Sequence, residues 1–284
     1  MNKKVKQAIA FAIFRLLGFL VVGVLFCILG FIVYNGAGVI SWEFLTAAPE
    51  EGMSAGGIFP AIVGTLCLVV GSIAFAFPVG VMSGIYIHEY LGNRWIVRVI
   101  RVMTNNLGGI PSIVFGLFGM ALFVNAFGFG DSILAGSCTL GLLILPLIIR
   151  TTEEALKAIP DSYRAGSYAL GAGKLQTIFR VTLPVAMPNI ITGLILSVGR
   201  VSGETAPILF TVAAYFLPRL PSGIFDQVMA LPYHLYVIAT SGTDIEASRP
   251  MAYGTALVLV IIVLAMNLLA TATRLHLGKK TKQD

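Results

Sequence analysis

Long apolar runs recur along the sequence, and they constrain the fold more than any other feature. Most are far longer than a β-barrel strand of about 10 residues and lack its alternating polarity, whereas about 20 apolar residues let a helix cross a bilayer. Only 11% of the residues are charged, against about 25% in a soluble domain. The sequence therefore predicts an all-α integral membrane protein with six transmembrane helices, over about residues 8–34, 58–87, 107–125, 132–149, 189–217 and 251–272.

The first apolar run is preceded by Lys3, Lys4 and Lys6, a basic start that is also typical of signal peptides. It continues to about Tyr34, however, which is much longer than the roughly 7–15 apolar residues of a signal peptide, and no clear small-residue cleavage site follows. We therefore interpret it as an uncleaved first transmembrane helix.

Basic residues are distributed unevenly around the apolar runs. Of the 19 Lys and Arg, 16 fall at the two termini and in the second and fourth connecting segments, whereas Arg219 and Arg249 fall on the other side and Arg200 within an apolar run. Because cytoplasmic loops are rich in Lys and Arg, this bias predicts that both termini and the loop over about residues 150–188 are cytoplasmic. Membrane orientation thus explains the net charge of +6, and no nucleic-acid partner is expected.

Catalytic and metal-binding patterns are missing from the sequence. Cys27, Cys67 and Cys138 fall inside apolar runs, where cysteine behaves as a small hydrophobe, so neither a disulfide framework nor a metal site is predicted. No P-loop, nucleophile elbow or pair of catalytic carboxylates occurs. We therefore expect no catalytic residue and no cofactor bound by this chain.

Arg200 and Glu204 interrupt the fifth apolar run four residues apart, which places both side chains on one face of a helix. Arg200 lies roughly 17 Å from the start of the run, close to the middle of a bilayer, where a charge usually faces protein or a watery path. Pro207 predicts a helix break beside the pair, and Ser202 and Thr205 offer further hydrogen bonds. The hydroxyls can equally bond back to their own helix, and the charges can equally form a structural ion pair.

The predicted cytoplasmic loop contains a recognisable spacing. Its residues resemble the E-A-A, three residues, G, nine residues, I-x-L-P signature of permease subunits in ABC importers, although Ala165 stands where the signature has glutamate. This resemblance implies that the loop docks on an ATPase, whereas an ordinary amphipathic connector is the alternative. The positions that carry it are Ala165, Gly166, Ser167, Gly171, Leu183 and Pro184.

Three further stretches narrow the resemblance. Residues 56–65, 109–116 and 200–211 are similar to the permeases of phosphate-specific ABC importers of the PstA type, the last through its Gly-Glu-Thr-Ala-Pro segment. The resemblance implies a type I ABC importer (MetI-like) permease fold in the bacterial inner membrane. It also implies a second, homologous permease, a dimer of cytoplasmic ATPase subunits that bind ATP and Mg, and a phosphate-binding protein outside.

These features together predict a permease subunit, embedded in membrane lipid, that imports inorganic phosphate by alternating access. Arg200 is the expected anion contact, because a guanidinium offers paired donors to the phosphate oxygens, and Glu204 is expected to neutralise Arg200 when the path is empty. Two alternatives remain at this point. One is a permease for another oxyanion, such as sulfate or molybdate, and the other is a membrane anchor or membrane-embedded enzyme.

Overall fold

Helices make up nearly all of the computed structural model, which describes residues 3–92, 95–241 and 245–280. Five of these helices are long and apolar enough to cross a membrane, and a bent pair supplies a sixth crossing when its arms are taken as one span. This agrees with the predicted all-α, six-span fold. The five are α1 (Lys3–Gly36), α3 (Phe59–Ile85), α6 (Ile133–Lys157), α9 (Leu183–Gly203) and α12 (Ile245–Lys280).

The third crossing is the bent pair. α4 (Trp95–Leu107) meets α5 (Ser112–Gly119), which the π-helix η4 (Met120–Ala126) prolongs, at an angle of 102°. The predicted span over residues 107–125 therefore covers the second arm of this pair, α5 with η4, and leaves out the first arm, α4. Pro111 stands between the two helices, and a proline disfavours helical backbone in the residue before it.

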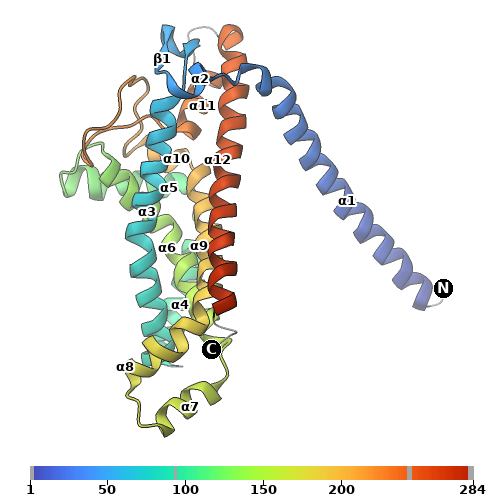
Figure 1. Cartoon of the computed structure of the whole chain (residues 1–284), viewed down its shortest axis with the longest axis vertical. Helices are drawn as coiled ribbons and strands as arrows, with labels where there is room; N and C mark the ends of the chain where they lie inside the picture. The colour runs from blue at the N-terminus through green and yellow to red at the C-terminus, as the bar shows by residue number, and fades with distance from the viewer. Residues whose placement is uncertain (1–2, 93–94, 242–244, 281–284) are drawn as a thin grey trace.

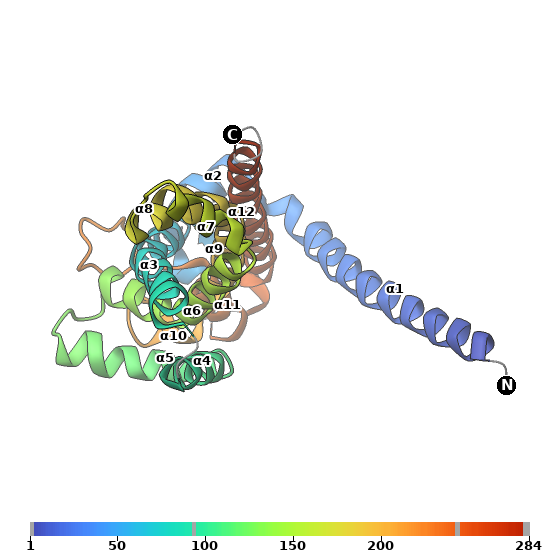
Figure 2. The ribbon, with the colours of Figure 1, turned by 90° about the horizontal axis from the view of Figure 1, so that it is seen from below.

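The centre of the bundle is the contact of α3 with α6, against which α9 and then α12 pack (Figure 2). α3 approaches α6 closely at Gly84, where a Cβ would lie 2.7 Å from the Cβ of Thr152. Small residues allow such close helix packing within a membrane. The π-helix η3 (Tyr86–Leu91), which continues α3, is thereby held near the end of α6.

The first helix leaves the bundle as a separate arm (Figures 1 and 2). It touches α12 near its own C-terminal end, where the ring of Phe31 lies edge-on to Tyr253 at 5.6 Å between centroids. Large apolar side chains along the rest of the arm are exposed on all its faces. A helix that is apolar all round suits a lipid or protein environment rather than water.

The fifth crossing differs from its predicted limits. α8 (Lys174–Thr177) and the π-helix η5 (Ile178–Thr182) run directly into α9, which ends at Gly203. Within the predicted span over residues 189–217, the long helix therefore ends at Gly203.

Residues after α9 continue the crossing without a long helix. They form the four-residue α10 (Ala206–Leu209) and then reach the start of α6. There the carbonyl oxygen of Thr211 accepts a hydrogen bond from the Ser132 N–H at 3.0 Å. Ile208 and Val212 are fully buried. The apolar character of this segment comes from burial inside the protein, which the sequence pattern does not distinguish from burial in lipid.

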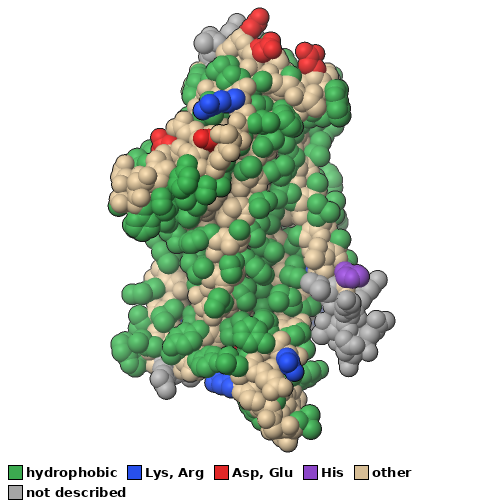
Figure 3. Space-filling view, turned by 60° about the vertical axis from the view of Figure 1, so that its left-hand side comes forward, with side chains coloured by type: hydrophobic (Ala, Val, Ile, Leu, Met, Phe, Trp, Pro, Cys, Tyr) green, Lys and Arg blue, Asp and Glu red, His purple; other side chains and the backbone are tan. Residues whose placement is uncertain are grey.

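Short elements gather at the end of the bundle where α6 begins (Figure 1). β1 and β2 form an antiparallel hairpin that pairs Pro49 with Gly56. Figure 3 shows acidic side chains together with a basic one toward this end, basic side chains at the other end and a wide hydrophobic surface between them. The short elements are η1 (Ala37–Val39), α2 (Trp42–Thr46), β1 (Pro49–Glu50), η2 (Glu51–Met53), β2 (Ala55–Gly56) and α11 (Leu231–Thr240).

The opposite end of the bundle carries α7 (Asp161–Ala169) and α8 as a projecting loop (Figure 1). The C-terminal end of α12 lies at the same end, and α1 descends toward it from its junction with the bundle. This arrangement suits the predicted placement of both termini on one side of the membrane. Which side that is stays a prediction.

Candidate functional site

The helical part of the fifth crossing ends at mid-depth in the bundle. Arg200 lies in the last turn of α9, and Glu204 follows with extended backbone (φ −76°, ψ 129°). The depth follows from the neighbours of Arg200, because it shares a cavity wall with residues in the central part of α6, namely Leu143, Pro146 and Leu147.

Arg200 and Glu204 form an ion pair in the described structure. The Arg200 Nε lies 3.5 Å from the Glu204 Oε1, which is beyond the usual 2.7–3.2 Å of an N–H···O hydrogen bond. The side chains are 34% and 17% exposed, respectively. The two charges therefore neutralise each other without a tight contact, and the guanidinium keeps donors for another acceptor.

The other residues predicted near the pair have separate positions. Ser202 is buried and donates to the Val198 carbonyl oxygen at 2.7 Å, so its hydroxyl bonds back to its own helix. Thr205 precedes α10, and Pro207 occupies the first turn of that helix. The break thus falls at Glu204 and Thr205, just before Pro207, where a proline requires the preceding helix to have ended.

A small cavity of about 110 Å³ lies beside Arg200. Its wall includes Arg150 of α6 and Asn105 of α4, so two arginines and an asparagine from three helices line one space. Arg150 was counted in the sequence as an ordinary cytoplasmic charge. In the structure it belongs to the same site as Arg200.

A neighbouring cavity of about 240 Å³ shares Asn105 and Arg150 with the first one. Here too the arginines are paired with carboxylates. Arg150 Nε lies 2.9 Å from Glu154 Oε1, and Arg101 Nε donates to Glu153 Oε1 at 2.6 Å. Three arginine–glutamate pairs therefore follow one another from mid-depth toward the end of α6.

The loop that carries the E-A-A spacing folds as a helical hairpin. α7 ends at Ala169, and Gly171, two residues later, has a φ of +82°, in the left-handed region that glycine adopts most readily. The N–H of Gly171 donates to the Tyr168 carbonyl oxygen at 2.9 Å. The hydroxyls of Ser167 and Thr177 lie 2.8 Å apart and join α7 to α8.

The same hairpin presents a concave surface with a volume of about 510 Å³. Gly166, Ser167 and Gly171 line it, while Ala165 is exposed on the same helix. Leu170 beside it is an almost fully exposed apolar side chain. A small-residue surface with an exposed apolar residue is suited to contact with another protein.

Leu183 and Pro184 lie at the start of α9, where the helix enters the bundle. Leu183 packs against the buried core, and Pro184 lies in the first turn of the helix, where a proline loses no hydrogen bond. The two residues therefore shape the junction between the hairpin and α9.

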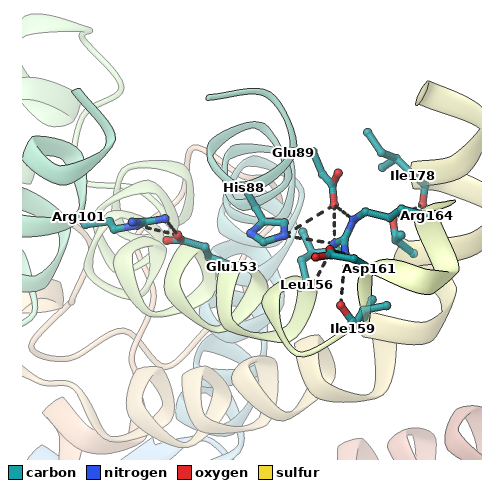
Figure 4. Close-up of polar contacts among 10 residues, drawn as sticks. His88, Glu89, Arg101, Glu153, Leu156, Ile159, Asp161, Arg164 and Ile178 are labelled. Atoms are coloured by element: carbon teal, nitrogen blue, oxygen red, sulfur yellow. Dashed lines mark hydrogen bonds and ion pairs between the residues drawn. The ribbon is translucent and has the colours of Figure 1, made fainter. Parts of the chain in front are cut away.

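Arg164 of α7 was not singled out from the sequence, and it makes a dense set of contacts (Figure 4). Its Nη2 lies 2.9 Å from Glu89 Oε1, and its Nη1 and Nη2 donate to two main-chain carbonyl oxygens at the end of α6. The one local signal is Asp161, three residues earlier, which also pairs with Arg164 at 3.2 Å. Glu89 lies 75 positions away along the chain, where no short spacing connects the two.

Comparison with known proteins agrees with this arrangement. Residues 76–283 match the family described as "Binding-protein-dependent transport system inner membrane component". The chain belongs to this family. It is therefore a permease subunit of an ABC transporter, not an enzyme, and a multi-pass protein of the bacterial inner membrane.

Curated relatives cover most of the chain. The probable ABC transporter permease protein YqgI of Bacillus subtilis is 34% identical over 95% of each chain. The phosphate transport system permease protein PstA of Mycobacterium leprae is 41% identical over 80% of this chain and 72% of the relative. A probable PstA of Methanocaldococcus jannaschii is 35% identical over 93% of this chain and 92% of its own.

Solved structures show the fold. An ABC transporter involved in import of the acidic polysaccharide alginate superposes with a TM-score of 0.68 over 96% of this chain and 98% of its own, at 15% identity. The inward-facing MetNI methionine ABC transporter gives 0.58 over 78% of this chain and 94% of its own, at 18% identity. The fold is thus that of a type I ABC importer permease.

Proposed function

We propose that this chain is the permease subunit of an ATP-driven importer of inorganic phosphate and forms half of the translocation path. The observation that carries the proposal is the loose Arg200–Glu204 pair, which lies at a helix break at mid-depth and beside a cavity that Arg150 also lines. The PstA relatives are named for phosphate transport, which supports phosphate as the anion.

Arg200 supplies the anion contact in this proposal. Its planar guanidinium matches two oxygens of a phosphate at once, whereas an ammonium acts only as a point charge. Glu204 occupies the guanidinium when no anion is present, which lowers the cost of a charge at mid-depth. Because the pair is separated by 3.5 Å, an anion displaces a weak partner rather than a strong one.

Arg150 and Arg101 continue the path toward the hairpin end of the bundle. Each is paired with a carboxylate of α6, so an anion leaving Arg200 meets successive guanidinium groups that are partly neutralised. Partial neutralisation keeps any one site from holding phosphate too tightly. The path opens to one side and then the other as α6 and α9 move relative to each other.

The α7–α8 hairpin supplies the contact with the ATPase. Its exposed small residues and Leu170 form the docking surface, and its direct continuation into α9 leads to Arg200. The complete importer contains a second, homologous permease, two ATPase subunits that bind ATP and Mg, and a phosphate-binding protein outside. This chain itself contributes no cofactor.

Phosphate uptake by an Arg200→Gln variant tests the proposal. Losing one charge-assisted contact is expected to lower uptake by about 10- to 100-fold, while co-purification with the second permease and the ATPase stays unchanged. Arg249→Gln is the matched control, because Arg249 is exposed and pairs with Glu246 in the first turns of α12. Normal uptake by an assembled Arg200→Gln complex would show that Arg200 is not the anion contact.

Glu204→Gln tests the neutralising role separately. The variant keeps the shape of the side chain and removes its charge, so it is expected to retain phosphate longer and to slow turnover. Uptake kinetics in reconstituted vesicles measure this. An unchanged rate would mean that Glu204 does not regulate the path by charge.

Another oxyanion remains the alternative substrate, because Arg200 alone does not discriminate among tetrahedral anions. Competition of labelled phosphate uptake by unlabelled phosphate, sulfate and molybdate separates these cases. We expect competition by phosphate alone. Uptake of any anion that requires both ATP and this chain would exclude a role as a membrane anchor.

A further inference from the structure

We propose that Arg164 is a positioning residue that couples the α7–α8 hairpin to α3 and α6, so that movement of the hairpin is transmitted to both walls of the anion path. This inference rests on the proposed role of the hairpin in docking an ATPase. It assigns the transmission to one side chain and its buried partner, Glu89.

The contacts of Arg164 reach two different helices (Figure 4). Toward the end of α6, Nη2 donates to the Leu156 carbonyl oxygen at 3.1 Å and Nη1 to the Ile159 carbonyl oxygen at 3.2 Å. Toward the end of α3, Nε and Nη2 donate to Glu89 Oε1 at 3.2 and 2.9 Å. One guanidinium therefore joins α7 to the ends of both α3 and α6.

Burial makes this junction stronger than an ordinary surface ion pair. The side chains of Arg164 and Glu89 are 14% and 6% exposed. His88 Nε2 lies 3.2 Å from Arg164 Nη2, so the imidazole closes another side of the junction. Charged hydrogen bonds that are shielded from water are costly to break singly, because the remaining partner is left unpaired.

A second and weaker link joins the same two elements. Lys174 of α8 places its Nζ 4.4 Å from the centroid of the Tyr90 ring. Tyr90 directly follows Glu89 in η3, so both helices of the hairpin contact this one segment. The π-helical end of α3 is thus the attachment point for the whole hairpin.

The position of the Arg164–Glu89 and Lys174–Tyr90 contacts indicates how movement of the hairpin reaches the rest of the bundle. Arg200 belongs to α9 and Arg150 to α6, and both helices are joined to the hairpin by the chain itself, whereas α3 is not joined to it and contacts it through Arg164 and Glu89. The cavity beside Arg200 lies between α6, α9 and α4. Without Arg164, a moving hairpin would still displace α9 and α6, which the chain joins to it, but its movement would no longer be transmitted to the end of α3.

Arginine is required because it contacts two elements at once. A guanidinium has five donors in a fixed plane, whereas a lysine ammonium keeps the charge but does not reach a carboxylate and two carbonyl oxygens in the same geometry. Arg164→Lys therefore keeps the charge and loses the bridge. Glu89→Gln keeps the shape of the acidic partner and loses the charge.

The test uses the complete complex, purified with its second permease and ATPase and reconstituted in vesicles. For wild type, Arg164→Lys, Glu89→Gln and the double variant, phosphate taken up is measured per ATP hydrolysed. We expect each single variant to lower this ratio at least about fivefold while ATP hydrolysis continues, and the double variant to be no worse than the singles because all three lose the same link. Arg249→Lys is the control, because its exposed pair with Glu246 is remote from the hairpin.

A second measurement does not depend on the substrate. ATP-dependent changes in amide hydrogen exchange are compared between wild type and Arg164→Lys. In wild type we expect changes in the hairpin, α9 and the ends of α3 and α6, and in the variant we expect the change at the end of α3 to be lost. This readout distinguishes the two proposals, because it stays informative if wild type imports an anion other than phosphate.

Two results would overturn the inference. One is an unchanged ratio of uptake to hydrolysis together with an unchanged exchange pattern in Arg164→Lys. The other is failure of both Arg164→Lys and Glu89→Gln to assemble, which would mean that the residues only stabilise the fold. Assembly of either variant with reduced coupling supports the positioning role.

Discussion

The Arg200–Glu204 and Arg164–Glu89 pairs contain the same two kinds of side chain in opposite circumstances. The first is local in sequence, separated by 3.5 Å and about one-third exposed at its arginine. The second joins residues 75 positions apart, is separated by 2.9 Å and is nearly buried at both members. The comparison shows that an ion pair suited to exchanging partners is loose, whereas one suited to holding helices together is tight and hydrogen-bonded on several sides.

The largest expected difference between the two pairs is in stability. Arg164→Ala leaves the Glu89 carboxylate buried without its main partner, which is expected to lower the free energy of unfolding by about 3 kcal/mol. Arg200→Ala removes a looser contact but leaves the partly buried Glu204 without its partner, so it is expected to cost less than Arg164→Ala, about 1–2 kcal/mol. Thermal denaturation of the purified complex measures both. Equal losses from the two substitutions would remove the distinction between a holding pair and an exchanging pair.

A smaller effect is expected from packing around the two sites. A Cβ at Gly116 of α5 would lie 2.9 Å from the Ala206 carbonyl oxygen, directly after the break at Glu204, whereas nothing lies within 4 Å of the corresponding position at Gly166 of α7. Gly116→Val is therefore expected to destabilise the chain by about 2 kcal/mol through overpacking. Gly166→Val is expected to change stability by less than about 0.5 kcal/mol.

The midpoint of thermal unfolding is the measurement for both glycines. A stable Gly116→Val variant would show that α5 and α10 separate easily. The segment that carries Glu204 would then be less rigid than its packing indicates.

The smallest expected effect comes from a group outside both pairs. Burial lowers the pKa of His234 in α11 from 6.5 to about 4, so the folded protein keeps this imidazole neutral. Below pH 6.5 the unfolded chain binds a proton that the folded chain does not bind, so this contribution to stability is full above pH 6.5 and falls as the pH decreases toward 4. At pH 5.5 the loss is expected to be about 1 kcal/mol.

Unfolding of His234→Gln between pH 7.5 and 5.5 separates this contribution from those of the arginine pairs. The variant is expected to lose less stability on acidification than wild type. His276→Gln, at an exposed position, is the control. The same pH dependence in wild type and His234→Gln would place the acid-sensitive group elsewhere.

The relative positions of residues that are close together in the sequence could be predicted from the sequence. Arg200 and Glu204 are one helical turn apart, and Pro207 indicated a break beside them, so their pairing and the interrupted helix followed from local geometry. The E-A-A-like spacing from Ala165 to Pro184 was also visible in the sequence, because it is a local pattern, whereas the helical hairpin with Gly171 at positive φ came from the structure.

Residues that tertiary packing brings together were not predictable in this way. Arg150 joins the site of Arg200 only because α6 and α9 pack side by side, and Arg164 reaches Glu89 only because α3 and α6 end near each other. Burial of the segment after α9 was not predictable for a related reason. Ile208 and Val212 are buried inside the protein. An apolar residue suits burial in protein and burial in lipid equally, so the sequence pattern does not distinguish the two.

The sequence by itself thus determined the membrane location, the helical class, the family and the local pair at Arg200, because apolar length, charge bias and short spacings act within single segments. Only the tertiary structure decided which arginines share a cavity and which side chain joins the hairpin to the bundle. Such contacts depend on how helices distant in the chain approach each other, through close-packing positions such as Gly84. A residue's own neighbours in sequence do not specify that approach.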